Sequence, residues 1–249
     1  MIKKIILSGI LLSLILAAGC GVNPKQSDEA RAHYMLGLSY LRENRMSQAM
    51  NEFRLAEQIN PKDPEVQAAL GQVLHVKEAY PEAEQRYLKA IQLSHEAPRF
   101  LNNLGALYLD MKRWDDAIRY FKATSSRLDF DNPEVPLSGM GYAYSQKGDY
   151  LQAVTFFKEA VAANMRYAPA YLGLGQAYYA LDKTEEAVSQ YREALRIAPN
   201  YAQAHYQLGL AQVKLRQTDE AVASFNEVIR LVPDTGLGKS SREHLKVLQ

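Results

Sequence analysis

The sequence is poor in the residues that build covalent or metal-held sites. Its 249 residues include one cysteine, Cys20, and five histidines with no paired metal-ligand spacing. A single cysteine cannot form a disulfide within the chain, so packing has to supply the stability of the fold. Spaced His and Cys ligands of the kind that hold zinc are missing as well. We therefore expect no cofactor, no metal site and no catalytic residue.

The chain also lacks an excess of either charge. Its 29 basic and 28 acidic residues give a formal net charge of +1. Binding to nucleic acid needs a basic surface that displaces counterions, so we expect no nucleic-acid partner. Two Gly-x-Gly pairs, 139–141 and 173–175, fall within predicted helices and lack the preceding strand of a phosphate-binding loop. We expect no small-molecule substrate either.

The first twenty residues differ from the rest. Lys3 and Lys4 precede an apolar run over residues 5–16, which is too short to span a bilayer comfortably. Small residues follow up to Cys20, so the segment 1–19 is predicted to be a secretory signal peptide. Its removal would change the formal charge from +1 to −1. The polar residues 21–29 that come next are expected to form a short tether.

The segment 16–20, Leu-Ala-Ala-Gly-Cys, resembles the lipobox of bacterial lipoproteins, with its leucine one place further from the cysteine than usual. The resemblance implies that Cys20 is acylated and becomes the first mature residue. Gly21 follows the cysteine where an aspartate would favour retention at the inner membrane. The implied location is the bacterial cell envelope, with the lipid on the periplasmic face of the outer membrane.

A glycine recurs through the remaining chain at a nearly constant interval. Successive differences are 34, 34, 36, 34 and 34 residues, for Gly37, Gly71, Gly105, Gly141, Gly175 and Gly209. A fixed period of this length is typical of an array of identical structural units. The two extra residues fall within the segment 124–136, where we expect an irregular loop. That loop is either a tolerated surface insertion or a change in superhelical pitch.

Residues 168–201 show what one unit contains. Apolar residues three and four positions apart define a first helix, namely Tyr171, Leu174, Tyr178 and Leu181. The pair 182–183 interrupts this pattern, and a second stripe then continues until Pro199. Thr184 is the predicted N-cap of the second helix. Gly175 and Ala187 are small where the two helices are expected to cross.

The order Leu-Gly, Tyr, Ala, Tyr, Ala and Pro within this unit resembles the tetratricopeptide repeat (TPR). The resemblance implies an all-α fold, a TPR solenoid in which helix-turn-helix units form a right-handed superhelix. Six units are expected, at residues 30–63, 64–97, 98–131, 134–167, 168–201 and 202–235. Ser240 and Glu243 form a capping-box pair for a last helix, within residues 236–249, that would cover the exposed end of the sixth unit.

In TPR proteins the first helix of each pair lines a concave groove, which the resemblance makes the expected site for a protein partner. The groove positions are Tyr34, Leu38, Leu41, Gln72, His75, Asn102, Leu109, Tyr142, Leu172, Gln176, Tyr179, Tyr206 and Leu210. Aromatic, aliphatic and amide side chains of this kind suit a helical or extended segment. Alternatively, about half of them only fill the packing between neighbouring first helices. Tyr34 and Leu38 stand where carboxylate-binding TPR proteins carry lysine and asparagine, so we expect no carboxylate clamp.

A lipid-anchored chain of six TPR units with a slipped period between the third and fourth resembles the pilotin lipoproteins of type IV pilus biogenesis, the PilF/PilW family. This resemblance implies a non-enzymatic scaffold that assists the assembly or localisation of an outer-membrane secretin. The alternative is a TPR adaptor for another envelope complex, one that serves polysaccharide export or protease regulation. In either case the partners are envelope proteins and the membrane.

Overall fold

The computed structural model describes residues 24–248. In these residues the chain forms thirteen α-helices. Their bounds are α1 Pro24–Arg42, α2 Met46–Ile59, α3 Pro64–Val76, α4 Tyr80–Leu93, α5 Pro98–Asp110, α6 Trp114–Ser125, α7 Glu134–Gln146, α8 Tyr150–Ala163, α9 Ala168–Ala180, α10 Thr184–Ile197, α11 Ala202–Lys214, α12 Thr218–Leu231 and α13 Gly236–Leu248. The predicted signal peptide and Cys20 lie outside the described residues.

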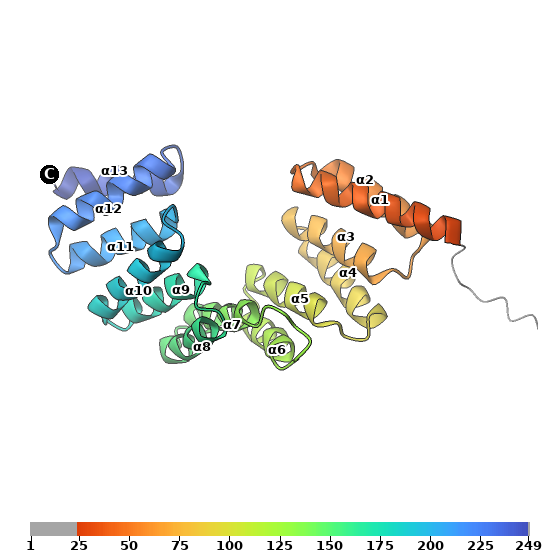
Figure 1. Cartoon of the computed structure of the whole chain (residues 1–249), viewed down its shortest axis with the longest axis horizontal. Coiled ribbons are helices and arrows are strands. Elements are labelled where there is room, and N and C mark those ends of the chain that lie inside the picture. Colours follow the sequence, from red (N-terminus) through yellow and green to blue (C-terminus); the bar gives the residue numbers. More distant parts are fainter. Residues whose placement is uncertain (1–23, 249) are drawn as a thin grey trace, which may run out of the picture.

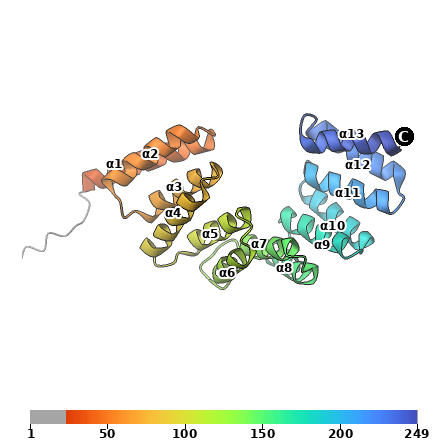
Figure 2. The same cartoon turned by 180° about the vertical axis from the view of Figure 1, so that it is seen from behind.

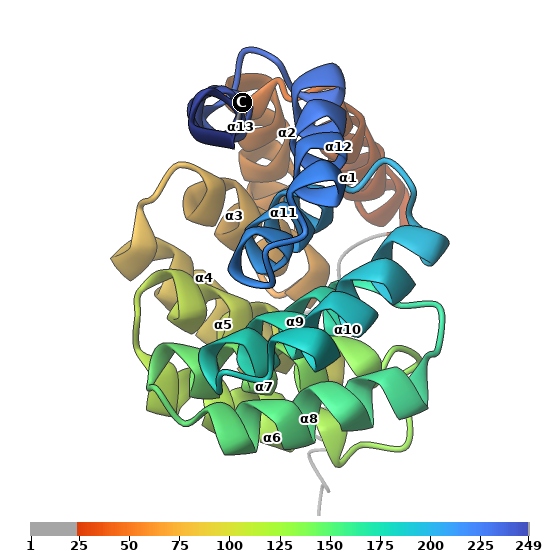
Figure 3. The ribbon, with the colours of Figure 1, turned by 90° about the vertical axis from the view of Figure 1, so that its left-hand side faces the viewer.

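The helices form a curved array of successive antiparallel pairs. In the middle of the array, the first helices α5, α7 and α9 lie on the inner side of the curve, and the second helices α6, α8 and α10 lie on the outer side (Figures 1 and 2). Seen along the long axis, the pairs follow a turn around a central region (Figure 3). The prediction of an all-α array of helix pairs is therefore confirmed.

Each pair is held together by an aromatic ring of the second helix that lies against the repeated glycine of the first. A Cβ atom added to any of the six glycines would approach that ring to within 2.5–3.0 Å. The rings belong to Phe53, Tyr87, Phe121, Phe157, Tyr191 and Phe225, all buried. The repeated alanine, such as Ala187, is also fully buried. The ring, 16 residues after the glycine, is the group for which the glycine leaves room.

Two rings lie against a second glycine as well. Phe121 faces Gly139 and Phe157 faces Gly173, and in both cases the glycine belongs to the first helix of the following unit. A Cβ atom at Gly139 would come within 2.6 Å of the Phe121 ring. The Gly-x-Gly pairs of the sequence are therefore packing features, in which one glycine serves the ring of its own unit and the other serves the ring of the unit before.

The turn inside each unit has a constant backbone conformation. One residue per turn has a φ between 58° and 80°, namely Asn44, Glu78, Lys112, Gly148, Asp182 and Arg216. The next backbone N–H donates to a carbonyl five residues earlier, as from Lys183 to Tyr178 at 2.9 Å. This pattern is the Schellman motif, which ends a helix and satisfies its last carbonyl groups. It ends the first helix at the interruption that the sequence shows at residues 182–183.

Three local predictions differ from the structure. Helix α1 begins at Pro24, so part of the predicted tether is helical. Thr184 is the first residue of α10 and is buried, while Lys183 occupies the N-cap without a side-chain hydrogen bond. Helix α13 already begins at Gly236, so Ser240 lies inside it and forms no capping box. The Schellman turn at Asp182 determines where α10 begins, and no side chain caps this helix. The prediction that Thr184 is the N-cap was therefore wrong.

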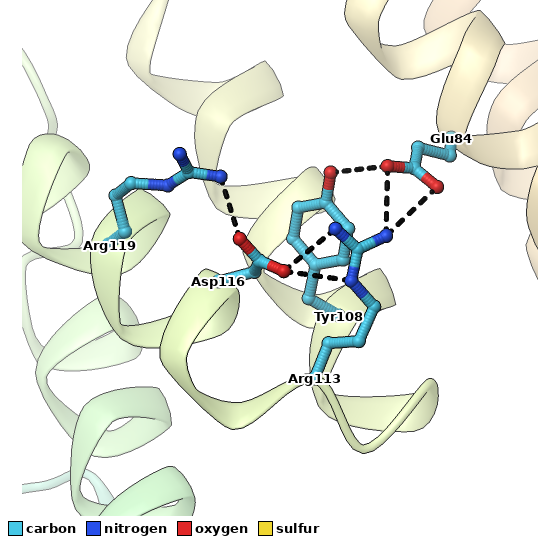
Figure 4. Close-up of polar contacts among 5 residues, drawn as sticks. All are labelled: Glu84, Tyr108, Arg113, Asp116 and Arg119. Carbon is cyan, nitrogen blue, oxygen red and sulfur yellow. Dashed lines mark hydrogen bonds and ion pairs between the residues drawn. The ribbon is translucent and has the colours of Figure 1, made fainter.

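The junction between the second and third units carries a polar network (Figure 4). The Tyr108 hydroxyl of α5 donates to the Glu84 carboxylate of α4 at 2.6 Å, and Arg113 Nη1 donates to the same carboxylate at 3.1 Å. Arg113 also pairs with Asp116, which in turn pairs with Arg119. Burial and the bond to Glu84 raise the pKa of Tyr108, so its hydroxyl keeps the donated proton. The network links two adjacent units.

Replacement of Gly175 by alanine is expected to destabilise the protein. The new Cβ would meet Tyr191 Cε1 at 2.5 Å, and Tyr191 is fully buried and cannot move aside. Overpacking of this kind costs about 1 to 3 kcal/mol. Gly236→Ala is the matched control, because a Cβ there meets no atom within 4 Å. Urea unfolding followed by circular dichroism should show a lower midpoint for Gly175→Ala only, and equal midpoints would contradict the steric account.

Removal of the Glu84 carboxylate should weaken the junction between units two and three. Glu84→Ala leaves the Tyr108 hydroxyl without its acceptor and Arg113 with one partner fewer, at an expected cost of about 1 to 2 kcal/mol. In a double-mutant cycle with Tyr108→Phe, the two losses should be less than additive. The exposed Glu159 of α8 provides a control, as Glu159→Ala. Additive losses in the cycle would show that the hydrogen bond contributes nothing.

Candidate functional site: a hollow in the concave groove

The inner face of the array has a hollow of about 440 Å³ between the first helices of units three, four and five. Helix α7 contacts both α5 and α9, so these three helices form a continuous wall. Five of the predicted groove residues line the hollow together, namely Asn102, Leu109, Tyr142, Leu172 and Gln176. Leu172 is largely buried, whereas Tyr142 is 46% exposed at the rim.

The floor of the hollow contains the edges of two core rings. Phe121 and Phe157 both line it, and so do Gly139 and Gly173, which lie directly against these rings. Any larger side chain at the two glycine positions would cover the rings. Sequence reasoning missed all four residues as parts of the site. The available signal was that Gly-x-Gly occurs only at 139–141 and 173–175 among the six repeats.

The hollow is uncharged. None of the described residues that line it is acidic or basic. Burial raises the pKa of Tyr201, and burial together with the nearby Glu134 raises that of Tyr167, so both lining hydroxyls stay protonated at neutral pH. Asn102 Oδ1 is buried and has no hydrogen-bond partner among the described residues. With Gln176 and Gln203 it supplies amide groups above an aromatic floor.

The other predicted groove residues lie along the inner face on either side of this hollow. Tyr34, Leu38 and Leu41 are partly buried and pack against the core of the first two units. Gln72 and His75 line a smaller hollow of about 290 Å³, where His75 Nε2 lies 2.7 Å from Asp110 Oδ2.

Towards the carboxyl end, the remaining three are Tyr179, Tyr206 and Leu210, which pack partly buried against the cores of the last two units. The predicted positions therefore include both groove lining and packing between first helices, and the five central ones share the hollow of about 440 Å³.

The described residues contain no group of three or more His, Cys, Asp or Glu side chains that could hold a metal ion. Among residues 24–248, no helix combines the length and apolar character needed to cross a bilayer. The central hollow of the groove is lined by apolar rings, hydroxyls and amides.

Comparison with known families identifies the repeats. Sequence signatures described as "Tetratricopeptide repeat" match residues 30–63, 96–165, 144–190 and 203–235, and one described as "TPR repeat" matches residues 175–215. The chain is a tetratricopeptide-repeat protein. TPR domains mediate protein–protein interactions and are typically non-enzymatic.

The relatives of this TPR protein include proteins of type IV pilus assembly. The type IV pilus assembly protein PilF of Pseudomonas aeruginosa is 28% identical over 141 residues, which make up 56% of this chain and 56% of that protein. The match thus spans little more than half of the relative. The chain is related to PilF in sequence, and this relationship suggests a place in the bacterial envelope.

Two solved structures share the fold of this TPR protein. The structure of Pseudomonas aeruginosa PilF has a TM-score of 0.74 at 20% identity, with 88% of this chain and 99% of that chain covered. The structure of PilW, described as a widely conserved type IV pilus biogenesis factor, has a TM-score of 0.77 at 15% identity, with 85% and 97% covered. In both cases the similarity in fold extends over almost the whole chain of the solved structure.

Proposed function

We propose that this TPR protein is a lipid-anchored scaffold that binds a segment of a protein partner in its concave groove and assists the assembly or localisation of an outer-membrane secretin in type IV pilus biogenesis. The proposal is based on the sequence relationship to PilF. It is supported by the groove, whose central hollow is aromatic and uncharged. The secretin is the partner that the pilotin resemblance implies.

The hollow suits an apolar side chain on an uncharged segment. A charged side chain placed there would lose its hydration without finding a counter-charge, which disfavours acidic and basic segments. The Phe121 and Phe157 rings offer flat apolar area to an incoming side chain. The amides of Asn102 and Gln176 match the free N–H and C=O groups of an extended backbone, whereas a helix satisfies these groups internally.

The membrane anchor belongs to the same proposal. Cys20 stands four residues before Pro24, where α1 begins, so acylation would hold the solenoid close to the lipid surface. One acyl chain gives only marginal membrane binding, and two or more are needed for stable attachment. The lipid would thus fix the groove at the membrane in which a secretin assembles.

Variants in the groove test the binding site. Tyr142→Ala removes an exposed ring from the rim, and Tyr34→Glu places a charge on the inner face of the first unit. A central aromatic contact is worth about 2 kcal/mol, so Tyr142→Ala should lower secretin capture roughly tenfold or more. The measurement is recovery of secretin on tagged full-length protein from detergent-solubilised envelopes, identified by mass spectrometry.

Leu151→Ala serves as the control in that experiment, because Leu151 is 70% exposed on the second helix α8 and does not line the hollow. Helical content should stay the same in all variants. Normal capture by both groove variants would place the binding site elsewhere. Recovery of export or protease machinery without secretin would replace the proposed partner with the alternative one.

The anchor is tested by Cys20→Ser. Without the thiol no acyl chain can be attached, so the protein should move from the membrane fraction to the soluble periplasmic fraction after cell fractionation. Metabolic labelling with a radioactive fatty acid should mark the wild type and not the variant. Labelling of both proteins, or equal membrane recovery, would contradict lipidation at Cys20.

A further inference from the structure

The two ends of the array are built differently. At the carboxyl end, α13 covers the last unit, where Leu245 joins the cluster of Phe225 and the His244 ring stacks on Phe225 at a centroid distance of 4.9 Å. At the amino end, α1 is the first described helix and packs on α2 and α3. No described residue covers its other side.

That uncovered side carries a largely apolar stripe, the open edge, formed by Ala32, Met35, Leu36 and Ser39. These positions are spaced three and four residues apart, so they lie on one face of α1. Leu36 is 43% exposed, whereas its counterparts Leu70, Leu104, Met140, Leu174 and Leu208 are at most 7% exposed. Ala32 is exposed too, although the residues at its position in all five later units are buried.

The later units show what kind of group covers this stripe. In each of them, the leucine or methionine at the Leu36 position is in the same core cluster as the aromatic ring of the preceding second helix, as Leu70 is with Phe53 and Leu208 with Tyr191. A small residue follows the ring three positions later and is buried with it, as Ala56 and Ala194 are. The covering group is therefore an amphipathic helix with an aromatic-x-x-small pattern.

We propose that the open edge of the first unit docks an amphipathic helix of another protein, one that carries an aromatic residue followed three positions later by a small residue. This helix would occupy the place that a preceding second helix occupies in the five later units. The interface would continue the one already repeated along the array, at a surface separate from the groove.

A second copy of the chain does not offer a matching end. The described carboxyl end is α13, whose exposed side chains are mostly polar or charged, namely Lys239, Ser240, Arg242, Glu243, Lys246 and Val247. An apolar stripe set against these groups would desolvate them without partners. End-to-end stacking of copies is therefore disfavoured, and a separate helix of the stated pattern remains the occupant that complements the edge.

The chain itself supplies a probe. Helix α10, Thr184–Ile197, covers a stripe in α11 that resembles the open edge, with Ala204, Gln207, Leu208 and Ala211 at the positions of Ala32, Met35, Leu36 and Ser39. A fluorescent, acetylated and amidated peptide of residues 184–197 should bind the full-length protein saturably in an anisotropy titration. A free helix of this length is only marginally stable, which lowers the absolute affinity of the peptide for every variant. The informative quantity is therefore the ratio of affinities between variants.

We expect Leu36→Asp to weaken binding of the peptide at least tenfold, and a Tyr191→Ala peptide to bind the wild type equally poorly. Leu88→Asp is the matched control, since Leu88 is 41% exposed on α4 and lies away from the edge. Unfolding midpoints should agree, because Leu36 is already exposed. Tyr142→Ala should leave peptide binding unchanged, which separates this surface from the groove.

Three outcomes would overturn the proposal. Equal peptide affinity of the wild type and Leu36→Asp, or no saturable binding, would show that the edge does not accept such a helix. A dimer in sedimentation experiments that Leu36→Asp abolishes would assign the edge to a second copy. Binding of the Cys20→Ser protein to phosphatidylethanolamine and phosphatidylglycerol vesicles that is lost on adding Leu36→Asp would assign it to lipid.

Discussion

The contact between an aromatic ring and a glycine, repeated in six units, determines how closely the two helices of each pair approach. Because the glycine has no Cβ, the ring lies directly against the backbone of the first helix. Each unit contacts only its neighbours, so the shape of the whole array follows from these local distances. The second glycines, Gly139 and Gly173, extend the same contact across two junctions between units.

The hollow in the groove is a consequence of the same constraint. Gly139 and Gly173 have no side chain that could cover the Phe121 and Phe157 rings. The edges of these rings are therefore open to the groove. The unequal ends of the array follow from the repeat as well. Every first helix carries the same stripe. In the five later units the preceding second helix covers it, whereas no described residue covers the stripe of α1.

Most of the fold could be predicted from the sequence, because the determinants are periodic. The glycine interval and the apolar spacing within residues 168–201 predicted the helix pairs, and the added residues predicted the irregular segment, which forms a loop between α6 and α7. The start of α10 could not be predicted from a capping rule, because the Schellman turn at Asp182 determines it.

The site was less predictable for a different reason. Asn102, Leu109 and Gln176 could be predicted from their positions in the first helices alone. The role of Gly139 and Gly173 depends instead on rings of the preceding unit, which lie 18 and 16 residues earlier in the chain. The local signal, a second glycine two residues before the repeated one, does not show which ring the glycine faces. The depth of the hollow therefore emerged only from the structure.

Hydrogen–deuterium exchange with and without a purified secretin measures most directly whether the concave groove is the binding surface. If the groove binds the secretin, we expect added protection in the first helices α5, α7 and α9, and unchanged exchange in the second helices α4, α6 and α8. Protection confined to those outer helices, or to the loop between α6 and α7, would contradict it.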